Sequence, residues 1–163
     1  MQFTVYLLLL GVILIFQSTV LETVAIAGVK PDLVMLLVVL NGFLLGAREG
    51  AFLGFAGGIL EDLFAGSYIG LNALSKMAAG YLAGAAGERL FRENIPIATI
   101  VTFFTSLAGL AVNYLLLLCL DIYVSPLHAF FRVALPCSAY TALLAPFVFW
   151  RIFRHIQVRS RDL

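Results

Sequence analysis

Apolar residues along the chain fall into six long runs, which are separated by short polar or charged segments. A helix needs about 20 consecutive apolar residues to cross the hydrocarbon layer of a membrane. The pattern therefore predicts an all-α integral membrane protein, with one domain over residues 1–163 and six transmembrane helices. The predicted spans are 3–21, 32–46, 50–65, 69–87, 97–120 and 127–150, followed by a basic tail over 151–163.

The second and third spans are short, and their pattern predicts a helical hairpin. About 15 residues at roughly 1.5 Å each reach only some 22 Å, which is less than the thickness of the hydrocarbon layer. We expect the turn between the two helices at Ala47-Arg48-Glu49. The second helix is expected to start at Asp32, because Pro31 suits a position where no N–H is needed and the carboxylate is stabilised by the helix dipole.

Composition supports this class of protein. Hydrophobic residues make up 63% of the chain, charged residues 12%, and the mean hydropathy is +1.06. Soluble domains have roughly a quarter of their residues charged, so this chain has too little polar material to cover a soluble globule. The net charge of +1 gives no argument for nucleic acid as a partner, and none is expected. Cys119 and Cys137 both lie in apolar runs and do not form a disulfide framework.

Lysine and arginine in the loops predict the orientation, because cytoplasmic loops carry an excess of both. With six spans, the basic residues on one side are Arg48, Arg89, Arg92, Arg151, Arg154, Arg159 and Arg161. The loops on the other side contribute only Lys30. We therefore expect both termini in the cytoplasm, with Arg48, Arg151 and Arg154 on the same side.

Polar residues inside the predicted spans are the first candidates for function. A charge near the middle of a membrane costs about 2.5–3.5 kcal/mol and needs a partner or a wet cavity. The intramembrane candidates are Asn72, Lys76 and Asn113. We hypothesise that Glu61 or Asp62 pairs with Lys76 inside the helix bundle. The alternative is that Lys76 reaches the outer headgroups while the two acids sit in water.

Small residues recur at every fourth position from the second span onwards. The positions are Gly46, Gly50, Gly54, Gly58, Asp62, Gly66 and Gly70. Such spacing lets two helix backbones approach closely in a membrane. The face formed by Gly50, Gly54, Gly58, Asp62 and Gly66 therefore either packs inside the bundle or accepts the helix of a partner. At Gly66 and Gly70 the same spacing is also consistent with turns.

No arrangement typical of an enzyme is evident. Glu61 and Asp62 are neighbours on one helix and point about 100° apart, so they do not face each other as a catalytic carboxylate pair does. His128 and Cys137 are isolated and do not form a metal-ligand set. We expect no catalytic residue, no metal and no cofactor.

Several of these segments together resemble a known family. The segments are Lys30-Pro31-Asp32-Leu33, Arg48, Gly54-Phe55-Ala56-Gly57-Gly58-Ile59-Leu60-Glu61-Asp62, Gly66 and Ile69-Gly70-Leu71-Asn72-Ala73-Leu74. In this order they resemble the bacterial rod shape-determining protein MreD family, over about a third of the chain. Lys76 departs from the apolar residue that this resemblance leads us to expect.

The resemblance implies a multi-pass protein of the bacterial inner membrane that acts as a non-enzymatic scaffold of the cell-elongation machinery. The implied partners are an MreC-like bitopic membrane protein, an MreB-like actin homologue and a glycan polymerase–transpeptidase pair. Through them the scaffold would link the cytoskeleton to peptidoglycan synthesis, while Arg48, Arg151 and Arg154 meet membrane lipid or the filament.

The family is also similar in organisation to the substrate-capturing subunits of energy-coupling-factor transporters. This similarity leaves an alternative function open, namely a subunit of a membrane transporter that binds a small, vitamin-type molecule. In that case Asn72, Lys76 and Asn113 would line the binding site.

Overall fold

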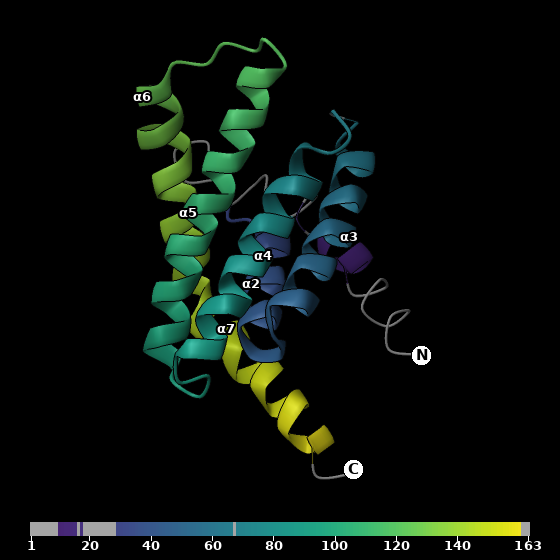
Figure 1. Ribbon diagram of the computed structural model, residues 1–163, viewed down its shortest axis with the longest axis vertical. Helices are drawn as coiled ribbons and strands as arrows, with labels where there is room; N and C mark the ends of the chain where they lie inside the picture. The colour runs from purple at the N-terminus through teal and green to yellow at the C-terminus, as the bar shows by residue number, and fades with distance from the viewer. Residues whose placement is uncertain (1–9, 16, 18–28, 67, 161–163) are drawn as a thin grey trace.

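The computed structural model describes residues 10–15, 17, 29–66 and 68–160, with side chains as far as Arg154. Every secondary-structure element assigned in this part of the chain is a helix, which confirms the all-α prediction (Figure 1). In chain order they are α2 (Leu33–Leu45), α3 (Ala47–Ala65), α4 (Leu71–Arg89), α5 (Ile95–Cys119), α6 (Pro126–His128), the π-helix η1 (Ala129–Ala134) and α7 (Leu135–Ser160).

Two stretches of the described chain are long and apolar enough to cross a membrane, Ile95–Cys119 and Pro126–Arg154. Helix α2 is strongly apolar but shorter, as its sequence predicts. Helices α3 and α4 have 19 residues each but are rich in glycine, alanine and charged residues. The first predicted span, 3–21, lies mostly outside the described residues. Six spans with cytoplasmic termini therefore stay a prediction.

Helix α2 is the central element of the bundle. It starts one residue after the predicted position, and Asp32 caps it, because the Asp32 carboxylate accepts a hydrogen bond from the Met35 N–H at 2.7 Å. One apolar cluster joins α2 to α4, α5 and α7, through residues such as Leu40, Ala79 and Phe149. A second cluster on α2 includes Leu10, Leu14, Val34 and Val38. Helix α2 is thus packed on more than one side, which explains why almost all its residues are buried.

The turn between α2 and α3 consists of one residue, Gly46, with φ +128°. L side chains rarely adopt this backbone conformation, so glycine is the residue that permits the reversal. The expected turn at Ala47-Arg48-Glu49 is wrong, because these residues form the first turn of α3. The hairpin itself is present, and α3 starts three residues earlier than predicted.

The connection from α3 to α4 also depends on glycine. Gly66 ends α3 with φ +61°, and Gly70 precedes α4 with φ +111°. Gly66 and Gly70 are therefore turn residues, which is the second of the two interpretations of their spacing. Helix α3 packs on α4 and α2, and Gly57 and Leu60 also bring it against Leu10 of the helical residues 10–15.

The helical run that starts at Pro126 continues through η1 and α7 to Ser160. The predicted end of this helix at residue 150 is therefore too early. Arg151 and Arg154 belong to the last turns of α7, because arginine ends the apolar run but favours helix. The predicted basic tail is thus helical from residue 151 to Ser160.

Helix α5 and the run from Pro126 form a hairpin that rises beyond the ends of α3 and α4 in Figure 1. No residue from 110 to 136 is buried, although most of them are apolar. We call these residues the distal hairpin. Its packing contrasts with that of α2, although both segments are strongly apolar.

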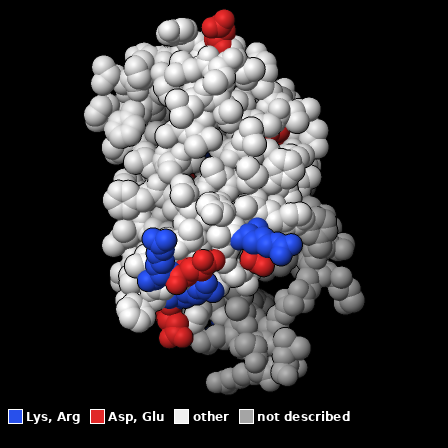
Figure 2. Space-filling view, viewed as in Figure 1, with Lys and Arg blue, Asp and Glu red and all other residues white. Residues whose placement is uncertain are grey.

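Charged side chains gather at one end of the molecule. In the face that Figure 2 shows, lysine and arginine lie low in the view, beside acidic side chains, and the surface above them carries few charges. This end holds the α2–α3 turn, the α4–α5 loop and the end of α7 (Figure 1). The basic residues from these segments are Arg48, Arg89, Arg92, Arg151 and Arg154. These arginines lie at one end of the molecule, and the predicted orientation requires them to lie on one side of the membrane.

Candidate functional site

The chain enters α2 through a non-helical segment, residues 29–32, that is fastened to two other parts of the molecule. The Asp32 N–H donates to Thr141 Oγ1 on α7 at 3.2 Å. The Leu33 N–H donates to Gln17 Oε1 at 3.1 Å. These two bonds satisfy backbone groups that the start of a helix leaves without partners. They also place the Asp32 carboxylate in the interior of the bundle.

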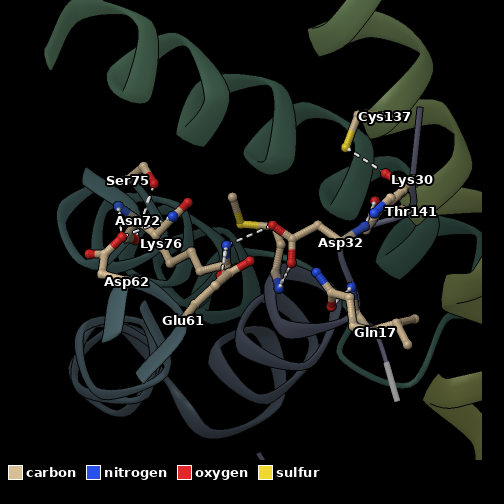
Figure 3. A network of polar contacts seen from close by, with 12 residues as sticks. Gln17, Lys30, Asp32, Glu61, Asp62, Asn72, Ser75, Lys76, Cys137 and Thr141 are labelled. Carbon is tan, nitrogen blue, oxygen red and sulfur yellow. Dashed lines mark hydrogen bonds and ion pairs between the residues drawn. The ribbon is translucent and has the colours of Figure 1, made fainter. Parts of the chain in front are cut away.

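An ion-pair triad joins three helices at this point. Lys76 of α4 has a side chain that is 1% exposed, and its ammonium lies 2.7 Å from Asp32 Oδ2. The same ammonium contacts Glu61 Oε2 on α3. Figure 3 shows Lys76 between the two carboxylates. We call Asp32, Lys76 and Glu61 the charge triad.

The hypothesis of an internal pair for Lys76 is confirmed for Glu61 and not for Asp62. The alternative, in which Lys76 reaches the headgroups, is wrong because the side chain is fully buried. Glu61 and Asp62 point to different places because neighbouring residues of a helix lie about 100° apart around its axis. The carboxylate of Asp32 is the partner that the sequence interpretation missed.

Asp62 is fully buried and caps the start of α4 from outside that helix. Its carboxylate accepts hydrogen bonds from the N–H groups of Gly70, Asn72 and Ala73 at 2.8, 3.2 and 3.3 Å. The Asn72 side-chain amide adds a fourth at 2.9 Å. The preceding residue, Gly70, has no side chain to serve as a cap, so Asp62 supplies the acceptors. Both Asp62 and Asn72 are therefore used to connect α3 to α4.

Helix α7 contributes a small polar face to the same region. Cys137 Sγ donates to the Lys30 carbonyl at 3.3 Å, one turn before Thr141. Cys137 and Thr141 are buried, as is Ser138 beside them. The sequence held a signal for this face of α7, because small polar residues four apart in an apolar helix mark the side that meets other helices. It also held a signal for Asp32 as a partner of Lys76, because the helix that Asp32 caps is too short to carry its start out of the membrane.

The glycine face of α3 packs against α4 of the same chain. A methyl group added to these glycines would collide with the backbone of α4: Gly50 with Gly80, Gly54 with Lys76, and Gly58 with Ala73. Of the two interpretations of this face, internal packing describes the structure. The expectation that this face accepts a partner helix is corrected accordingly, because α4 already covers it. The close approach also brings Lys76 next to α3.

The remaining candidates lie apart from this region. Gly66 is exposed, and a side chain added there would meet nothing, so it is a turn residue and no part of the packed face. Asn113 is partly exposed on α5, and no hydrogen bond or ion pair of the described residues joins it to the triad. Arg48, Arg151 and Arg154 are exposed at the charge-rich end, where Arg154 lies 5.7 Å from the ring of Trp150.

The arrangement connects helices rather than presenting reactive groups to a substrate. The polar groups of the triad and of the Asp62 cap are directed toward one another (Figure 3). Within the residues that the structure describes, no group of three histidine, cysteine or acidic side chains is placed to hold a metal ion. Lysine inside a membrane protein marks a candidate functional site, and here its partners are two carboxylates from neighbouring helices.

Comparison with known proteins relates the chain to one family. The family model for the rod shape-determining protein MreD matches residues 1–157. The match covers the helices described here up to the last turn of α7. No curated protein and no solved structure matches the chain.

Proposed function

The chain belongs to the MreD family of rod shape-determining proteins, and from that premise we propose that it is a non-enzymatic scaffold of the inner membrane. The family is a membrane-protein family that takes part in rod shape determination, and it is not a known enzyme family. The scaffold would hold an MreC-like bitopic protein and the actin-like cytoskeleton in reach of peptidoglycan synthesis, including the glycan polymerase–transpeptidase pair.

One observation carries this proposal: the buried polar groups of the bundle are used to fasten its own helices. Lys76 is enclosed by Asp32 and Glu61, and Asp62 is occupied by the start of α4. A scaffold needs an interior whose polar groups hold its own helices together, because its partners dock on the outer faces. A transporter subunit instead needs polar groups that face an open site.

The outer faces supply the surfaces on which partners would dock. Helix α3 exposes Phe55, Leu63 and Phe64. The single membrane helix of an MreC-like protein would pack on this exposed side of α3. At the charge-rich end, each basic residue near an anionic membrane surface contributes about 1 kcal/mol of attraction. Arg48, Arg151 and Arg154 would thus meet lipid headgroups or the filament.

The alternative, a subunit that binds a small molecule for a transporter, has less support from the geometry. Of the three residues expected to line its site, Lys76 and Asn72 are engaged inside the bundle. Asn113 is not joined to them by any hydrogen bond of the described residues. The scaffold is therefore the function that we propose.

A pull-down of the tagged protein from its native membrane in mild detergent tests the proposal. We expect the MreC-like protein or the actin homologue among the recovered proteins. Recovery of ATP-binding-cassette ATPases with a coupling subunit would contradict the scaffold and make the chain part of a transporter.

The docking face is tested by a pair of matched substitutions in the same assay. Phe55→Ala changes the exposed side of α3, and Phe104→Ala changes an exposed phenylalanine of α5. We expect the first variant to reduce recovery of the MreC-like protein and the second to leave it at the wild-type level. Equal recovery with both variants would place the docking face elsewhere on the bundle.

A further inference from the structure

We propose that the charge triad is a binding site for one exchangeable proton, held at the Glu61 carboxylate. The proton delivers a single positive charge to that carboxylate. This inference does not depend on the scaffold role, because it rests on the charges and contacts of the interior alone.

The first step is the balance of charge around Glu61. Among the described residues, the charged groups that act on its carboxylate are Asp32 at the start of α2, Lys76 from α4 and Asp62 from its own helix. Asp62 has its own compensation in the four N–H donors at the start of α4. From α7 the titratable group is the Cys137 thiol, whose hydrogen atom goes to a backbone carbonyl. Two carboxylates thus share one ammonium, and the triad has one negative charge in excess.

The second step is the position of this excess charge. Helix α2 has 13 residues, so at about 1.5 Å per residue Asp32 lies about 20 Å from the charge-rich end of the bundle. A hydrocarbon layer of about 30 Å that begins near that end encloses the triad. Each carboxylate side chain is 16% exposed and Lys76 1%. An uncompensated charge in such surroundings is costly, and a bound cation removes the excess.

The third step is the difference between the two carboxylates. Asp32 accepts the Met35 N–H and lies at the start of α2, where the helix dipole stabilises an anion. Glu61 lies near the end of α3, where the dipole has the opposite sign, and it neighbours the Asp62 carboxylate. Its Oε2 atom is buried and, among the described residues, contacts no polar group except the Lys76 ammonium. Asp32 therefore keeps Lys76 as its ion-pair partner, and Glu61 takes the added proton.

Occupancy of this site changes how firmly α3 is held against α2. With the proton bound, the triad is neutral and all three helices are joined through Lys76. Without it, the two carboxylates repel each other across one shared ammonium. The cohesion of the α2–α3–α4 bundle thereby responds to the concentration of protons.

The test compares full-length wild type with Glu61→Gln in detergent, with Glu93→Gln as the control. Glu93 is exposed on the α4–α5 loop and undergoes the same chemical change. The measured quantity is the temperature at which half of the protein is lost from the monodisperse peak in size-exclusion chromatography. One series lowers the pH at constant sodium. The other replaces choline by sodium at constant pH and ionic strength.

For wild type and Glu93→Gln we expect the midpoint to rise by about 4 °C or more as the pH falls. The sodium series is expected to leave the midpoint unchanged. Glu61→Gln, which carries no charge to neutralise, is expected to show no rise and to match the occupied wild type. The proposal is overturned if the wild-type midpoint does not rise with falling pH, if it rises with sodium instead, if Glu61→Gln responds as wild type does, or if Glu61→Gln does not fold.

Discussion

The bundle of α2, α3 and α4 and the distal hairpin are built from the same kind of apolar sequence, yet they are held together differently. In the bundle, glycines bring α3 and α4 into backbone contact, and buried charges join the helices. In the distal hairpin no residue is buried, and α5 makes few contacts with η1. Lipid is as apolar as leucine, so apolar side chains alone give little reason for two helices to associate. Close approach and polar contacts supply that reason in the bundle.

This contrast predicts that substitutions in the bundle destabilise the protein and that those in the distal hairpin do not. The largest effect is expected for Lys76→Met, which leaves Asp32 and Glu61 facing each other without a cation. Removing one partner of a buried ion pair costs about 3–5 kcal/mol. Denaturation by SDS in mixed micelles measures the change in the free energy of unfolding. Arg132→Met in the exposed η1 segment is the control, with an expected change within about 0.5 kcal/mol.

A smaller decrease in the free energy of unfolding is expected for Gly54→Ala. The new methyl group would collide with the Lys76 carbonyl, so α3 and α4 must separate, which costs about 1–3 kcal/mol. The same titration measures it. Gly11→Ala is the matched control, since nothing lies near the added methyl group there and alanine favours helix by about 1 kcal/mol. Equal effects of the two substitutions would contradict the close packing of α3 on α4.

Asp62→Ala is expected to loosen the start of α4 without unfolding the bundle. It removes the acceptor of three backbone N–H groups, and loss of a helix cap costs about 0.5–2 kcal/mol. Hydrogen exchange of Gly70, Asn72 and Ala73 is therefore expected to become faster. Glu49→Ala, at an exposed position of α3, should leave these amides unchanged. Unchanged exchange in Asp62→Ala would show that other groups cap α4.

The smallest effect is expected for Phe131→Ala in the distal hairpin. Phe131 is 62% exposed, so in a membrane it contacts lipid, and its removal leaves no cavity. The free energy of unfolding should change by no more than about 0.5 kcal/mol. Phe43→Ala in α2, where the side chain is fully buried, provides the comparison and should cost clearly more. A large loss for Phe131→Ala would mean that the distal hairpin packs against something in the intact protein.

Several features of the bundle could be predicted because they depend on local sequence. The apolar runs predict the helices from α2 to α7 to within a few residues, apart from the end of α7. The start of α2 was placed to within one residue, at Asp32, since proline and an acid before an apolar run favour a helix start. The cost of an isolated charge in lipid favoured an internal partner for Lys76 among Glu61 and Asp62, but it did not decide between them or exclude a position at the headgroups.

Other features could not be predicted because they depend on how helices distant in sequence meet. The spacing of the glycines indicates close packing against another helix. The same spacing would serve a helix of the same chain or a helix of a partner protein. Only the position of α4 shows that the face is internal. The reversal at Gly46 was misplaced because charged residues suit both a turn and the first turn of a helix, and the backbone angle decides between them.

The amino-acid sequence by itself determined the class of protein and the approximate positions of its helices, and it marked Lys76 as a residue in need of a partner or of the headgroups. These follow from the transfer of side chains between water and lipid, which each residue experiences independently. The tertiary structure decided which carboxylates share Lys76, that Asp62 caps α4, and that α7 fastens the start of α2 through Thr141. These depend on distances between separate helices, which are set by the packing of all their side chains together and by no local pattern.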